Sequence, residues 1–102
     1  MSKVHYLTVG KTRYPYKTGY KVFKEFQNKH GKDAMTGVGL TMEDLVYLHY
    51  LGMKAGAKQA EVECAFPTFA AFEDFIDSDF NLIGKLDEIF TKFLPKEPEE
   101  GK

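Results

Sequence analysis

The stretch DSDFNLIGKLDE, residues 77–88, carries side-chain oxygens at nearly the spacing of a calcium-binding loop. Such a loop places oxygen ligands at its first, third, fifth and twelfth positions and needs glycine at the sixth for a sharp turn. The four ligand positions hold Asp77, Asp79, Asn81 and Glu88. The sixth position is Leu82. Leucine does not permit that turn, so we predict no metal site. We interpret the acids as residues at the start of a helix, with Ser78 or Asp79 as its cap.

The other residues capable of chemistry form no catalytic pattern. His5, His30 and His49 lack the HxxxH or HxxE spacing that places two metal ligands on one helical face, so we expect each to be hydrogen-bonded or solvated. Cys64 is the only cysteine, which excludes a CxxC pair, and we expect it to be a small buried hydrophobe. The segment TGVGL lacks the GxGxxG order of a nucleotide site, and no serine lies in a GxSxG setting. The sequence therefore predicts no enzyme and no cofactor.

The elements that would position any binding residues begin with a predicted β-hairpin. Residues 4–9 alternate in polarity, Gly10 and Lys11 form a two-residue turn, and TRYPYK follows with Tyr14 and Tyr16 on one face. Pro15 cannot donate a ladder hydrogen bond, so we expect this second strand to be short or to have an open edge.

Helical patterns occupy the rest of the chain. The first predicted helix has Thr18 as its cap and Gly31 as its stop. After the glycine-rich loop GKDAMTGVGL, a second helix is predicted to begin after Thr41 and to end near Gly56. A short third helix capped by Thr68 and a fourth, amphipathic helix over Leu82–Phe93 complete the pattern. The prediction is an α+β fold, an N-terminal β-hairpin packed on three to four α-helices.

Composition and length define the class of protein. A chain of 102 residues with 43% hydrophobic content predicts one globular domain, residues 1–94, and the proline-punctuated acidic segment 95–102 is expected to be a disordered tail. No stretch reaches the roughly eighteen apolar residues of a membrane span, and the start MSKVHY lacks a secretory apolar segment. We therefore expect a cytoplasmic protein with no membrane partner.

The net charge of −1 conceals an uneven distribution. Residues 1–60 carry ten Lys/Arg and four Asp/Glu, and residues 61–102 carry four and eleven, so the halves stand at +6 and −7. This division favours an electrostatic partner, including a weak homo-oligomer in which basic and acidic halves meet. The alternative is that these charged side chains only lie on solvent-exposed faces and have no partner.

Two segments are candidates for a binding surface. Phe66, Phe69, Phe72 and Phe75 recur every three residues, a spacing at which some rings bury and others can anchor a partner, although all four could instead be core. Residues 1–32 combine eight Lys/Arg with four tyrosines, as a single-stranded nucleic-acid surface would. The pI of about 6.3 argues against a dedicated nucleic-acid binder.

The order of the segments resembles a known family. VHYLTVGKTRYPYK, GYKVFKEFQNKHGK, LTMEDLVYLHYLGMKAG, F..FEDFID and a final amphipathic helix follow one another over residues 4–94. In order, length and spacing they are similar to the small tail assembly chaperones of long-tailed bacteriophages and prophages. The resemblance implies a non-catalytic protein in the cytoplasm of the bacterial host that binds the tape measure protein and helps to recruit tail tube subunits. The alternative is a small phage or host regulator that binds nucleic acid through its basic N-terminal hairpin.

Overall fold

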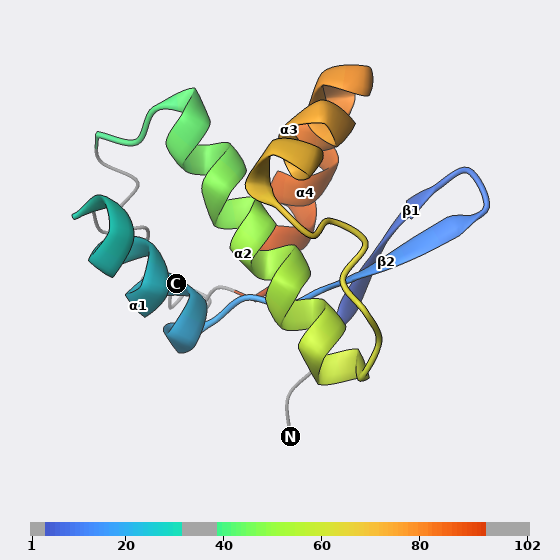
Figure 1. The fold of residues 1–102 in the computed structure, drawn as a ribbon, viewed down its shortest axis with the longest axis horizontal. Helices are drawn as coiled ribbons and strands as arrows, with labels where there is room; N and C mark the ends of the chain where they lie inside the picture. The colour runs from blue at the N-terminus through green and yellow to red at the C-terminus, as the bar shows by residue number, and fades with distance from the viewer. Residues whose placement is uncertain (1–3, 32–38, 94–102) are drawn as a thin grey trace, which may run out of the picture.

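The protein has an N-terminal antiparallel hairpin followed by helices, the α+β fold expected from the sequence (Figure 1). The computed structural model describes residues 4–31 and 39–93. The elements are β1 (His5–Val9), β2 (Thr12–Tyr16), α1 (Tyr20–His30), α2 (Met42–Ala60), α3 (Phe69–Ser78) and α4 (Asn81–Thr91). Most of the predicted glycine-rich loop and the whole of the predicted tail, residues 95–102, lie outside the described residues.

The hairpin has the predicted two-residue turn, in which Gly10 has a φ of 61° that favours glycine. Leu7 pairs with Tyr14, and Tyr6 pairs with Pro15, so the second strand continues through its proline. Because side chains alternate across the strands, Leu7 and Tyr16 face the core and are buried, whereas Tyr6 points to the exposed face.

The second and third helices begin at the predicted caps. The Thr41 hydroxyl accepts a hydrogen bond from the Asp44 N–H at 3.1 Å, and the Asp44 carboxylate accepts one from the Thr41 N–H at 3.0 Å, which forms a capping box. The Thr68 hydroxyl accepts a hydrogen bond from the Ala71 N–H at 3.1 Å. Gly31 ends α1 in the left-handed conformation, as predicted.

One predicted boundary of α1 and one of α2 are wrong. Thr18 does not cap α1: Gly19 occupies the N-cap position, and the buried Thr18 hydroxyl has no hydrogen-bond partner among the described residues. The helix α2 does not end near Gly56 but continues to Ala60, where Glu61 takes the left-handed conformation. Gly56 stays helical because its missing side chain makes room for the hairpin.

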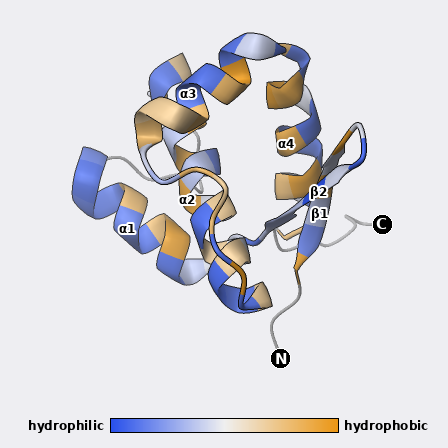
Figure 2. Ribbon diagram, turned by 45° about the vertical axis from the view of Figure 1, so that its right-hand side comes forward, coloured by the Kyte–Doolittle hydropathy of each residue, from blue (hydrophilic) through white to orange (hydrophobic). Residues whose placement is uncertain are grey.

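The acidic stretch at residues 77–88 is mostly helix. Phe80, and neither Ser78 nor Asp79 as predicted, occupies the N-cap position of α4, and it makes no side-chain cap hydrogen bond. The Asp79 carboxylate, one residue earlier, accepts a hydrogen bond from the Asn81 N–H at 3.1 Å. The fourth helix turns its apolar stripe inward, with Leu82 and Leu86 almost fully buried. Figure 2 shows the hydrophobic residues of α4 on the side that faces the other helices. A helix over these residues excludes the calcium-loop conformation.

Candidate partner-binding site

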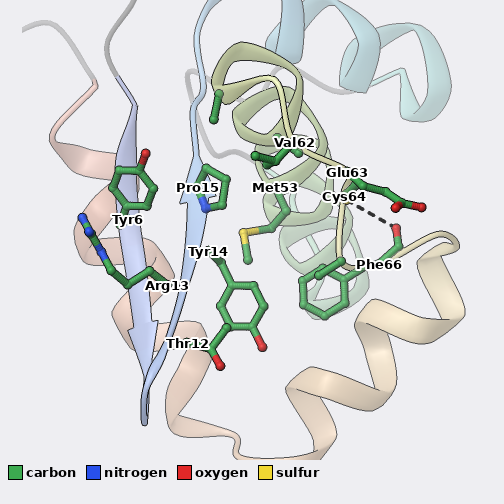
Figure 3. Close-up of a pocket in the computed structure, with 13 residues that line it drawn as sticks. Tyr6, Thr12, Arg13, Tyr14, Pro15, Met53, Val62, Glu63, Cys64 and Phe66 are labelled. Atoms are coloured by element: carbon green, nitrogen blue, oxygen red, sulfur yellow. Dashed lines mark hydrogen bonds between the residues drawn. The ribbon is translucent and has the colours of Figure 1, made fainter.

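The candidate site is an apolar groove of about 380 Å³ between the hairpin, the C-terminal half of α2 and residues 61–66, which connect α2 to α3 (Figure 3). We call it the hairpin groove. Its lining includes Tyr6, Arg13, Tyr14, Met53, Val62, Glu63 and Phe66. A concave and mainly apolar surface with few polar groups is the usual form of a binding site.

Two glycines of α2 bring its wall of the groove close to the hairpin. A Cβ atom on Gly56 would lie 2.5 Å from the Pro15 carbonyl carbon, and one on Gly52 would lie 2.7 Å from the Tyr16 ring. The Lys17 N–H donates a hydrogen bond to the Gly52 carbonyl at 3.1 Å. The strand β2 therefore packs on the backbone of α2 itself, which fixes the distance between two walls of the groove.

The floor of the groove is aromatic and rests on the core. The Tyr14 ring stacks on the Phe66 ring at a centroid distance of 5.5 Å, and its other neighbour is the edge of Phe75 at 5.3 Å. Met53 is buried beside them. Cys64 was predicted to be buried, but it is only half-buried. Its Sγ atom donates a weak hydrogen bond to the Phe66 carbonyl at 3.5 Å. These contacts hold the floor in place without a ligand.

The rim of the groove exposes apolar surface beside charge. Tyr6 is 42% exposed and Val62 is 54% exposed. The Arg13 guanidinium carbon lies 4.2 Å from the centroid of the Tyr6 ring, a cation–π contact that orients both side chains. Glu63 is also among the lining residues. The groove therefore offers an apolar floor, one cation and one anion.

The four predicted phenylalanines occupy different positions around this floor. Phe72 is fully buried and Phe66 nearly so, whereas Phe69 and Phe75 are half-buried against the same core. Their rings form a cluster, with centroids 5.1 Å apart for Phe66 and Phe72 and 4.7 Å apart for Phe66 and Phe75. Of the four, Phe66 lines the hairpin groove. A role for Phe66, Phe69, Phe72 and Phe75 in partner binding stays a prediction, and in this groove it falls to Phe66.

The sequence patterns predicted some of the groove residues and missed others. The alternation of the second strand predicted Tyr14 and Tyr16 on one face, and in the structure that face is the inward one. The second helix was expected to end near Gly56, so the pattern did not place Val62 next to its last turn, and nothing local to Met53 indicates that the hairpin packs beside it. The available signal was Gly52 and Gly56, four residues apart on one helix face, where small side chains permit close packing.

A hydrogen-bond network centred on the buried His49 joins β2, α2 and α4. The His49 ring, fully buried in α2, has its Nδ1 atom 2.7 Å from the Tyr16 hydroxyl and its Nε2 atom 2.8 Å from the Asp87 carboxylate. Because an ionised carboxylate only accepts, Nε2–H donates to Asp87, and in the neutral imidazole Nδ1 then accepts from the Tyr16 hydroxyl. Burial, and then the charge of Asp87, raises the pKa of the Tyr16 hydroxyl, which keeps it a donor.

The three members of this network differ in exposure and lie outside the hairpin groove. His49 has no exposed surface, whereas the Asp87 side chain is half-exposed. Within residues 4–31 and 39–93, no group of three or more His, Cys, Asp or Glu side chains is arranged to hold a metal ion. The same described residues contain no helix that is long and apolar enough to cross a membrane.

Comparison of the chain with models of protein families, with curated proteins and with solved structures gives no match. The resemblance to tail assembly chaperones therefore rests on the order, length and spacing of the sequence segments.

Proposed function

We propose that the protein is a non-catalytic tail assembly chaperone that holds an apolar segment of the tape measure protein in the hairpin groove and helps to recruit tail tube subunits. The observation that carries the proposal is a preformed apolar groove with a stacked aromatic floor, Tyr14 on Phe66. The family and the partners come from the sequence resemblance, and the groove supplies a place for the contact. Such a protein would act in the cytoplasm of the bacterial host.

The chemistry of the groove fits a helical partner. Recognition of an amphipathic helix by an apolar groove needs a few side-chain anchors and no reaction. A groove of about 380 Å³ accommodates one or two large side chains, not a whole helix. Arg13 and Glu63 at the lining can pair with charges that flank those anchors. We therefore expect short apolar anchors, repeated along a long helical partner, to be bound one at a time.

Co-expression with the tape measure protein of the same phage genome tests the proposal. Val62→Asp places a charge on the apolar rim at an exposed position, so the fold should survive while the amount of co-purified tape measure protein falls at least tenfold. Phe80→Asp is the matched control, because Phe80 is similarly exposed but lies outside this groove, and it should retain the partner. Failure of the parent chain to retain the tape measure protein would refute the function. Equal retention by Val62→Asp would refute the site alone.

Binding of nucleic acid is the second candidate function. The observation in its favour is that Tyr6 and Tyr20 are exposed beside cations, with Arg13 on the first ring and the Lys24 ammonium 6.0 Å from the second. Exposed rings and cations are the groups that stack bases and contact phosphates. A single-stranded oligonucleotide bound through phosphates would dissociate steeply with added salt, whereas apolar binding in the hairpin groove would persist. The two functions are therefore separated by the salt dependence of binding.

A further inference from the structure

A second groove, of about 460 Å³, lies between the start of α2 and the end of α3. We call it the acidic groove. Its apolar residues are Met42, Val46, Ile76 and Phe80, and its charged residues are Glu43, Glu73 and Asp77. Val46 and Ile76 form a buried floor, whereas Met42 is exposed and Phe80 is 65% exposed. Among the described residues that line it, none is Lys or Arg. The surface therefore combines uncovered apolar area with unbalanced negative charge.

A surface of opposite character lies at the start of α1. Tyr20 is 75% exposed, the highest value among the large hydrophobic residues of the described chain. Its surroundings are basic, because Lys17, Lys21 and Lys58 line the adjoining hollow with a single acid, Glu61. The Lys24 ammonium adds a further cation 6.0 Å from the Tyr20 ring. We call Tyr20 with Lys17, Lys21 and Lys24 the basic knob.

The basic knob and the acidic groove lie toward opposite ends of α2. The acidic groove includes Met42 in the first turn of this helix, and the hollow beside the knob includes Lys58 near its end. At ~1.5 Å per residue, these two positions are roughly 24 Å apart along the axis. In Figure 1 the start of α1 lies at the lower side of the molecule and the end of α3 at its upper side. One chain therefore cannot place its own knob in its own groove.

We propose that a second copy of this chain occupies the acidic groove, with the Tyr20 side chain on the apolar floor and the lysines of the basic knob facing Glu43, Glu73 and Asp77. Charge complementarity selects this occupant, since the groove lining carries three carboxylates and the knob three ammonium groups. The contacting surfaces differ, so the association is heterologous and propagates from head to tail. It is independent of the proposed chaperone function.

The association is weak and sensitive to salt. One aromatic side chain buries about 150–250 Å², far less than the roughly 1,200–2,000 Å² of a stable interface. The surrounding ion pairs are exposed, and their attraction is screened over about 8 Å at physiological ionic strength. Assembly therefore needs a high protein concentration and low salt, or a partner that gathers several copies.

Sedimentation equilibrium of the full chain at low salt tests the proposal with two variants that each remove one surface. Tyr20→Ser removes the knob and Phe80→Ser removes the edge of the groove, and both positions are exposed, so each variant should keep the melting temperature of the parent. The parent should show a mean mass that rises with concentration and falls at high salt. Each variant alone should be monomeric. An equimolar mixture should form dimers and nothing larger, because one intact groove then meets one intact knob.

The control and the refuting outcomes follow from the same geometry. Tyr6→Ser removes an exposed aromatic residue from the hairpin groove and should self-associate like the parent. A parent that stays monomeric up to about a millimolar at low salt would refute the proposal, since this range corresponds to roughly 4 kcal/mol of affinity. Oligomers that persist in either variant, or a mixture that stays monomeric, would refute the assignment of these two surfaces.

Discussion

Removal of one hydroxyl from the buried network should destabilise the whole fold. Tyr16→Phe keeps the ring, which contacts Phe93 at a centroid distance of 6.2 Å, but leaves the Nδ1 atom of fully buried His49 without its donor. A buried polar group left unsatisfied costs about 1–3 kcal/mol. For a domain of about this length, each kcal/mol lowers the melting temperature by roughly 4–8 °C. We expect Tyr16→Phe to melt about 4–24 °C below the parent.

Urea unfolding followed by circular dichroism measures the coupling, with His49→Phe and the double variant Tyr16→Phe/His49→Phe completing a cycle. Because replacing both partners with apolar rings removes the unsatisfied atom, the double variant should lose less stability than the two single variants combined, by about 0.5–3 kcal/mol. Tyr6→Phe, on the exposed face of the hairpin, should be neutral. Unchanged unfolding of Tyr16→Phe, or additive effects in the cycle, would refute the network as the link between β2, α2 and α4.

Two further changes probe the core and its titration. Leu86→Asp buries an unpaired charge at a position with no exposed surface and should cost more than about 4 kcal/mol, leaving little soluble folded protein, whereas Lys85→Asp on the outer face of α4 should fold. A Leu86→Asp variant that melts like the parent would show that the inward face of α4 is wrongly assigned. The raised pKa of Tyr16 gives stability that is complete below the ordinary tyrosine pKa of about 10 and is lost as pH rises above it. Melting temperatures from about pH 9 to 11.5 should therefore fall more steeply for the parent than for Tyr16→Phe, and parallel curves would contradict this.

Local signals in the sequence were sufficient for the order and type of the elements. The turn at Gly10 and Lys11, the caps at Thr41 and Thr68 and the αL stop at Gly31 each act through hydrogen bonds or backbone angles within a few residues. Such features are readable from neighbouring residues alone. The amphipathic period of the fourth helix likewise predicts that Leu86 lies in the core, and it is fully buried.

Features that depend on distant parts of the chain were not accessible in this way. Gly56 carries the local signature of a helix end, yet it lies inside α2 because the hairpin packs against it. His49 was expected only to be satisfied or solvated, and its partners come from 33 residues before it and 38 residues after it. The hairpin groove also forms only where the hairpin, the C-terminal half of α2 and residues 61–66 pack together. Pairings of this kind are decided by tertiary packing, which periodicity does not encode.

The contact of β2 with the two glycines of α2 determines how the hairpin groove can adapt to what enters it. Because the backbone of Pro15 lies against Gly56, the hairpin wall and the helix wall are in direct contact and have no room to move closer together. Binding then requires little ordering of either wall, and the conformational entropy lost on association falls mainly on the partner and on the rim side chains. Evolution toward a different partner would accordingly proceed through substitutions in the connector, at Val62 and Glu63, while Gly52 and Gly56 stay unchanged. Selectivity would thereby change without any loss of the scaffold.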